Sequence, residues 1–292
     1  MKKYQYKKVN AFTLGISRGN PAAYLMVEDG ITAEEMLGIG KEHKGFVSEV
    51  VFCEKSEKAD YKLTYFSSEC EVDFCGHGTV AAMYDIISEN KELMKKPEVI
   101  IETNKKGVLT VYNNISDDGV VYITAPKAIH LEQKLSKEKI AAALGILTEN
   151  ISDKFPVDFI DAGLRTLLVP IESFSKEISI YPDETNLKDF CLANGIDIIL
   201  IFSKETNSDK YMAHTRVFAP KFGYLEDPAT GSGNSAFANY MLKNNLWNGE
   251  PIAVEQGGNN IVFNQVNLKV KDNCVLFGGK ATTVIAGEYY IY

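Results

Sequence analysis

The sequence predicts an α+β protein of two lobes, in each of which strands wrap around one apolar helix. Short strand-like runs dominate the chain, with helical patterns between them. Each half also contains an acidic residue, then a glycine-rich turn, then an unusually apolar helix. A length of 292 residues, 45% hydrophobic and 24% charged, suits a globular protein of about two domains.

The repeated segment is the strongest of these observations. Residues 71–78 lead into a helix at 79–87, and residues 226–233 lead into a helix at 234–242. Both helices are apolar around most of their circumference, so we expect them to be buried on nearly all sides. Their glycine-rich N-termini would then meet at the cleft between the lobes.

The remaining elements follow from local patterns. Thr32 and Glu35 form a capping box that opens a helix ending near residue 43. Further helices are expected at 136–145 and 186–195. Strands are expected at 8–13, 22–27, 47–53, 61–66, 99–103, 107–113, 120–125, near 157, 166–171, 198–203, 210–219, near 252, 266–270, 274–277 and 282–291.

The polar turn at 113–119 is the best candidate boundary. We expect an N-terminal lobe of residues 1–118, completed by the C-terminal strand at 281–292, and a C-terminal lobe of residues 119–280.

Composition excludes several classes of function. With 31 Lys and Arg against 39 Asp and Glu, the net charge is −8, and no basic stripe is present to bind nucleic acid or an anionic membrane. No membrane span or signal peptide is evident, so a cytoplasmic location is expected. The five cysteines are an odd number at scattered spacings, which favours reduced thiols.

The glycine-rich turns are candidate anion sites. A helix N-terminus carries free N–H groups and about half a positive charge, so two such turns could hold a carboxylate, although glycines at these places also permit tight packing. Neither turn has the lysine of a phosphate loop or the spacing of a dinucleotide site, so no nucleotide cofactor is expected.

Cys70, Cys75 and His77 provide three metal ligands at most, with no partner pair elsewhere, so no metal site is expected. At a helix N-terminus Cys75 could be an activated thiol, or it could be a small buried hydrophobic residue.

Six segments together resemble the phenazine biosynthesis PhzF-like family and follow its order across essentially the whole chain. The first segment is residues 10–13 with 19–23, and the second is Ser48 and Glu49, which precede Val-Val-Phe. The other four are residues 74–79, 216–220, 226–232 and 278–281. That family is similar in fold to diaminopimelate epimerase. The resemblance therefore implies two pseudo-symmetric lobes, each a curled, mostly antiparallel sheet around a central helix, with the active site between them.

The resemblance also implies an isomerase that needs no metal or organic cofactor and acts on a small carboxylate-bearing metabolite. Glu49 would move the proton at carbon as general acid and base, with His77 and Asp227 in the same pocket. The residues that would bind the substrate are Ser48, Cys75, Gly76, Gly231 and Ser232. The family often forms homodimers, and the sequence leaves that question open.

Alternatives remain at this point. From the residues alone, Glu49 could be a surface acid on an edge strand, His77 a structural histidine, and Asp227 a turn or N-cap residue. A racemase or epimerase that uses Cys75 as one base is a second hypothesis, although Thr230-Gly-Ser232 stands where a second thiol would be required. A protein that binds a small acid without turnover is the third. The segment 258–265 also replaces the family's usual Met-Gly-Arg-Pro-Ser-like run.

Overall fold

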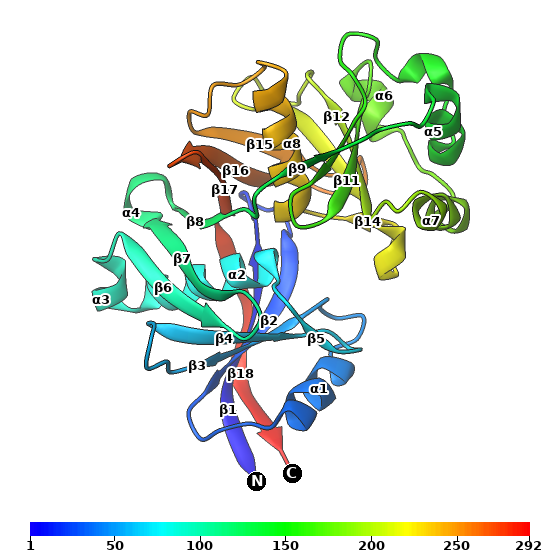
Figure 1. The fold of residues 1–292 in the computed structure, drawn as a ribbon. Helices are drawn as coiled ribbons and strands as arrows, with labels where there is room; N and C mark the ends of the chain where they lie inside the picture. The colour runs from blue at the N-terminus through cyan, green and yellow to red at the C-terminus, as the bar shows by residue number, and fades with distance from the viewer. The chain divides into compact units, whose positions relative to one another are not determined.

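The computed structural model describes residues 1–292, which divide into two compact units. Unit 1 contains residues 1–124 and 278–292, and unit 2 contains residues 125–277. Figure 1 shows the helices and strands of both units, which are described separately below. The lobe boundaries expected at 118 and 280 remain a prediction. None of the helices combines the length and hydropathy that a membrane-spanning helix requires.

Unit 1 is a curled sheet with a central helix. Strand β18 pairs with β1 and β1 with β2, both antiparallel; β2 and β3 are parallel, β3 and β4 antiparallel, β4 and β6 parallel, and β6–β7–β8 antiparallel. The strands are β1 (Lys2–Ala11), β2 (Asn20–Val27), β3 (Val50–Glu54), β4 (Tyr61–Phe66), β5 (Glu71–Val72), β6 (Glu98–Thr103), β7 (Gly107–Asn114), β8 (Val120–Thr124) and β18 (Ala281–Ile291). The helices are α1 (Ala33–Glu42), α2 (Gly76–Glu89), α3 (Lys91–Met94) and α4 (Ile115–Asp118).

Unit 2 repeats the same succession of pairings. Strands β9, β10 and β11 are antiparallel, β11 and β12 parallel, β12 and β13 antiparallel, β13 and β15 parallel, and β15 and β16 antiparallel. The strands are β9 (Ile129–Leu131), β10 (Asp158–Asp161), β11 (Arg165–Pro170), β12 (Ile198–Ser203), β13 (His214–Phe218), β14 (Glu226–Asp227), β15 (Ile252–Gln256), β16 (Asn264–Lys271) and β17 (Cys274–Gly279), whose last two residues belong to unit 1. The helices are α5 (Lys137–Leu144), α6 (Phe174–Ile178), α7 (Glu184–Ala193) and α8 (Gly231–Lys243), with 3-10 turns at Thr148–Asn150 and Pro220–Phe222.

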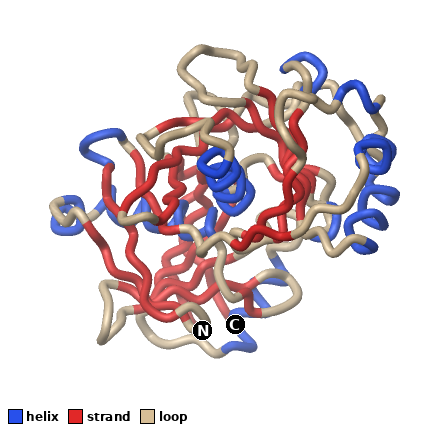
Figure 2. The backbone as a smooth tube through the Cα atoms, turned by 45° about the horizontal axis from the view of Figure 1, so that its top comes forward, coloured by secondary structure: helices blue, strands red, loops and turns tan.

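One helix is central in each unit. Helix α2 packs against β1, β2, β3, β8 and β18, and α8 packs against β10, β11, β12 and β16. Figure 2 shows helical segments enclosed by strands. Buried residues, most of them apolar or glycine, lie on several sides of both helices, and burial inside a curled sheet removes this surface from water. The predicted α+β class, with two pseudo-symmetric sheets each around a helix, is confirmed.

Most elements lie close to their predicted positions. The capping box is formed, with Thr32 accepting from the N–H of Glu35 and the Glu35 carboxylate accepting from the N–H of Thr32. Helix α6 and strand β9 were not expected, because both are too short to show a period. The strand predicted from residue 210 begins only at His214, and the first strand begins earlier than expected, at Lys2.

A buried ionic network fixes α2 to the sheet of unit 1. Lys7 on β1 is 4% exposed, and its Nζ lies 2.8 Å from an Asp85 carboxylate oxygen on α2. The Tyr24 hydroxyl on β2 donates to the same oxygen at 2.7 Å, and Thr283 on β18 donates to the other. Because the Lys7 and Asp85 charges are shielded from water, removing Lys7 would leave the Asp85 carboxylate buried without a counter-charge.

We expect Lys7→Met to lower the free energy of unfolding by about 3 kcal/mol, since it leaves the Asp85 carboxylate buried without its cation. Urea unfolding followed by circular dichroism measures this. Lys95→Met is the matched control, because Lys95 pairs with Glu92 on the surface and should change stability by less than about 0.5 kcal/mol. Equal effects of the two substitutions would show that the network does not hold α2.

Candidate active site

The first turn of α2 is organised by a cysteine. Cys75 is the N-cap residue, in an extended conformation, and its Sγ accepts a hydrogen bond from the N–H of Gly78 at 3.3 Å. The Thr79 hydroxyl donates to the Cys75 carbonyl at 2.7 Å, and it also bonds with the buried Tyr65 hydroxyl. The thiol is therefore held at the start of the helix by its own first turn.

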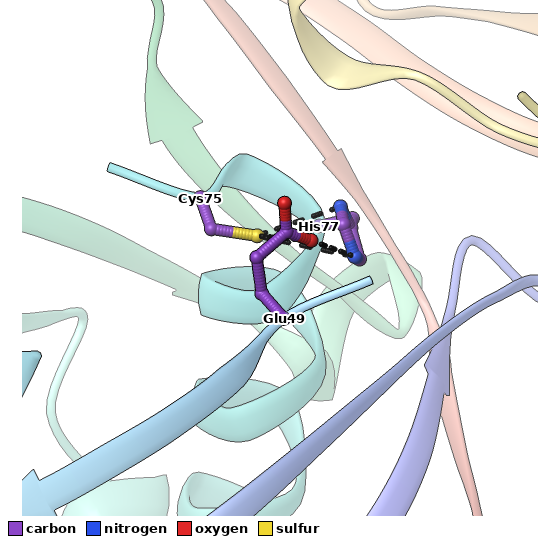
Figure 3. A group of neighbouring side chains, drawn as sticks. All are labelled: Glu49, Cys75 and His77. Carbon is purple, nitrogen blue, oxygen red and sulfur yellow. Dashed lines mark hydrogen bonds and ion pairs between the residues drawn. The ribbon is translucent and has the colours of Figure 1, made fainter. Parts of the chain in front are cut away.

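Glu49 and His77 lie beside this sulfur. The Cys75 Sγ is 3.6 Å from a Glu49 carboxylate oxygen and 3.5 Å from His77 Nδ1. His77 Nε2 is 3.4 Å from the same Glu49 oxygen. Figure 3 shows the three side chains directed toward one another at the start of α2. The result is a compact group of thiol, carboxylate and imidazole within unit 1.

Glu49 is placed there by the sheet. It immediately precedes β3, whose neighbours are β2 on one side and β4 on the other, so the alternative of an edge strand is wrong. The carbonyl of Glu49 accepts from the N–H of Ala23 and continues the β2 pairing by one residue. Its side chain is 20% exposed and that of His77 is 14% exposed, so neither is a solvated surface group.

Gly78 allows α2 to come this close to β3. A Cβ at this position would lie 2.9 Å from the Cys75 sulfur and 3.0 Å from a methyl group of Val51. Any other residue would push the first turn away from the strand that carries Glu49. Ser48 and Gly76, the neighbours of Glu49 and Cys75 in sequence, are both partly buried.

These side chains are also the ones that could hold a metal ion. The Glu49, Cys75 and His77 donor atoms all lie within 4.8 Å of one another. Cys70, which the sequence suggested as a third ligand, is exposed and interacts with Ser67 instead. The family resemblance implied a common pocket for Glu49 and His77, but the residues alone did not link Glu49 to Cys75 and His77, which lie 26 and 28 positions farther along the chain.

In unit 2 the corresponding segment carries Asp227. This residue is buried, lies in β14 opposite Val217, and its Oδ1 accepts from the N–H of Ala229. Gly231 and Ser232 follow as the first two residues of α8, and a Cβ on Gly231 would lie 2.3 Å from the ring of Phe277. A side chain at Gly231 would therefore clash with this ring, so the turn requires glycine for packing, whatever it binds.

A buried amide that the sequence analysis did not assign holds this turn. Gln256, at the end of β15, accepts from the Thr230 N–H at 3.0 Å and from the Asn234 amide at 2.7 Å. It donates to the Asp227 carbonyl at 2.9 Å and to the Thr230 hydroxyl at 3.3 Å. The Thr230 hydroxyl accepts from Gln256 and makes no capping bond to α8. The only signal in the sequence was an amide ending a strand before a glycine.

A second missed contact fixes the start of the turn. The fully buried Arg216 on β13 forms a two-point ion pair with Glu226, with both N–O distances 2.9 Å. Its remaining nitrogen donates to the carbonyls of Glu177 and Ile180. Glu226, the residue before Asp227, is therefore held by this ion pair, and the residues after Asp227 are held by Gln256.

The strand registers relate the two units position by position. Phe66 pairs with Glu71 and with Val50, and Phe218 pairs with Glu226 and with Ile199. Counting from these pairs, Ile198 corresponds to Glu49, Thr230 to Cys75 and Ser232 to His77. The group of three titratable side chains is therefore present in unit 1 and has no counterpart in unit 2.

Comparisons with known proteins agree with the resemblance noted from the sequence. The family model described as phenazine biosynthesis-like protein matches residues 9–287. Among curated proteins, the uncharacterized isomerase YfhB of Bacillus subtilis is 31% identical, over 88% of this chain and 87% of its own length. The uncharacterized isomerase CA_C3446 of Clostridium acetobutylicum is 27% identical, over 84% of this chain and 82% of its own length.

A solved structure gives the same result at the level of the fold. The crystal structure of the PhzF-family phenazine biosynthesis protein of Bacillus anthracis has a TM-score of 0.88 and 26% identity, with all of both chains covered. The predicted resemblance and the predicted isomerase are confirmed. The match over nearly the whole chain, together with relatives that are named isomerases, shows that this protein is an isomerase and belongs to the phenazine biosynthesis-like protein family.

Proposed function

We propose that this isomerase moves a proton at carbon of a small carboxylate-bearing metabolite, with Glu49 as general acid and base and without a metal or organic cofactor. The observation that carries the proposal is the group at the start of α2, where the Glu49 carboxylate, His77 and Cys75 lie within hydrogen-bonding reach and are largely shielded from water. Shielding favours proton abstraction because a hydrated carboxylate is a weak base toward carbon.

The step conserves atoms and electrons within the substrate. The Glu49 carboxylate takes the proton, and the electron pair of the broken C–H bond moves into the adjacent unsaturated or carboxylate group. Glu49 then returns the proton to a conjugated carbon on the same face. His77 Nε2, 3.4 Å from the carboxylate oxygen, orients Glu49 and supports its charge. Asp227 is assigned to substrate orientation on the grounds of the family resemblance.

Backbone groups are assigned to the substrate carboxylate. The N-cap Thr230 offers no side-chain bond to the first turn of α8, so the N–H groups of Gly231 and Ser232 are not taken by a cap. The positive end of this helix suits an anion. Ser48, Cys75 and Gly76 complete the set of residues that we assign to substrate binding.

The correspondence between the units supports a single base. A racemase that uses two bases needs one on each face of the substrate carbon, and the thiol and imidazole of unit 1 correspond to the hydroxyl residues Thr230 and Ser232. Hydroxyl groups do not act as bases without a further activating group. Removal and return of the proton by one carboxylate fits this arrangement better.

A second candidate function rests on the sulfur. The Cys75 thiol lies 3.6 Å from the Glu49 carboxylate, which is close enough for Glu49 to accept its proton. In this case Cys75 would be the base that attacks the carbon-bound proton, as in an amino-acid racemase or epimerase, and Glu49 would only activate it.

The first test is deuterium incorporation in D2O, followed by NMR on a panel of small amino acids, hydroxy acids and dihydroaromatic acids. We expect the wild type to place deuterium on one carbon of one compound, and Glu49→Gln to lower that rate by at least about 1,000-fold, since the amide cannot carry a proton. Glu54→Gln, at the other end of β3, is the matched control and should retain the wild-type rate.

Cys75→Ala separates the two candidates. Exchange that survives in Cys75→Ala and is lost in Glu49→Gln supports the carboxylate as base, whereas exchange that is lost in Cys75→Ala supports the thiol, including when Glu49→Gln lowers it as well. If a compound raises the melting temperature but never exchanges, the proposal of turnover is wrong and the protein only binds a small acid.

Gln256 should act as a positioning residue for Asp227 and the α8 turn. Gln256→Leu leaves the Thr230 N–H, the Asn234 amide and the Asp227 carbonyl without this partner. We expect a loss of about 3 kcal/mol of stability and about a tenfold or greater fall in kcat with KM raised much less. The control is Gln265→Leu on β16, whose amide bonds only to Asn267. Stability lost with unchanged kcat would restrict Gln256 to a structural role.

A further inference from the structure

We propose that Glu49, Cys75 and His77 also form a binding site for Zn²⁺, and that occupation of this site switches the isomerase off. Binding of the ion is argued from the geometry of these residues alone. The inhibitory consequence rests on the proposed function of Glu49.

The spacing of the three donor atoms matches one face of a zinc tetrahedron. Zinc bonds are about 2.3 Å to sulfur, 2.0–2.1 Å to imidazole nitrogen and 2.0–2.2 Å to a carboxylate oxygen. Tetrahedral angles then separate nitrogen from oxygen by about 3.4 Å, and sulfur from either atom by about 3.6 Å. In the structure His77 Nε2 is 3.4 Å from Glu49 Oε2, and Cys75 Sγ is 3.6 Å from Oε2 and 3.9 Å from Nε2.

The charges also balance. A Cys75 thiolate and a Glu49 carboxylate together carry two negative charges, which a neutral His77 and one Zn²⁺ bring to zero. The N–H of Gly78 donates to Sγ at 3.3 Å and holds the sulfur in place. Binding would exchange the thiol proton for the metal ion.

The site needs little rearrangement and remains reachable. Cys75 and His77 are fixed on the first turn of α2, and Glu49 is fixed by the β2–β3 pairing. The side chains of His77 and Glu49 are 14% and 20% exposed, which leaves a path for the ion. Three protein ligands leave the fourth position of the tetrahedron to water, as in zinc sites that are open on one side.

Occupation would stop proton transfer directly. Glu49 Oε2 lies beside His77 and Cys75, and an ion bound there would hold the carboxylate that the proposed reaction uses as its base. Zinc would thus act as a competitor of the proton and of the substrate, and the metal-free protein is the active form.

The experiment uses the full chain, freed of metal with a chelator and then titrated with Zn²⁺ by calorimetry and with Co²⁺ by absorption. We expect one zinc ion per chain and a sulfur-to-cobalt charge-transfer band. Cys75→Ser should abolish that band, and both Cys75→Ser and His77→Ala should weaken zinc binding by about 100-fold. Cys70→Ser, a variant of an exposed thiol outside the group, should keep the wild-type affinity and band.

Deuterium exchange with the substrate found above is then measured with zinc present and after the chelator is restored. Inhibition that follows the binding curve and is reversed by the chelator supports the proposal. Absence of saturable binding, or binding unchanged in both Cys75→Ser and His77→Ala, overturns it even if Glu49→Gln abolishes exchange. Tight binding to the three residues without inhibition overturns the switch, while the role of Glu49 as base is still decided by Glu49→Gln.

Discussion

The close contact between a central helix and the strand beside it positions everything that we assign to chemistry in unit 1. The absence of a side chain at Gly78 lets the first turn of α2 rest on Val51, two residues after Glu49 in the sequence. The Lys7–Asp85 pair secures the same helix farther along its length. With both constraints in place the sulfur, the carboxylate and the imidazole meet without any long loop, and their separations are set by packed backbone.

Unit 2 has the same packing of a central helix on a strand but presents different chemical groups. Gly233, which corresponds to Gly78, lets α8 approach Val217 and Ile198. The strand that precedes the turn is held by the Arg216–Glu226 pair, and the turn itself by Gln256. In place of a titratable group the first turn of this helix presents backbone N–H groups and a serine. One fold thus yields a unit with proton-carrying side chains and a unit suited to holding an anion.

The sequence predicted these features unequally, for physical reasons. The glycine-rich turns before apolar helices carry their own local signal, so the central helices, the repeat and the fold class could be predicted. Glu49 could not be placed, because Val50 and Val51 break the alternation that would show which face of the strand it takes. The contacts of Gln256 and Arg216 could not be predicted either. Their partners lie 29 and 10 residues away in the sequence, and these contacts depend on how the strands pair. The short helix α6 has too few residues for a period to be visible.

The two central helices differ in how their first turns are satisfied, and this difference separates their roles. In α2 the N-cap residue Cys75 accepts a hydrogen bond from the N–H of Gly78, so the start of this helix binds a sulfur atom of its own chain. In α8 the hydroxyl of the N-cap residue Thr230 accepts from Gln256 and does not cap the helix. The positive end of α8 is therefore not bound by this side chain and suits an anionic ligand. In our proposals a carbon-bound proton and a metal ion would compete for the lone pairs of the side chains beside α2, whereas the start of α8 would bind an anion.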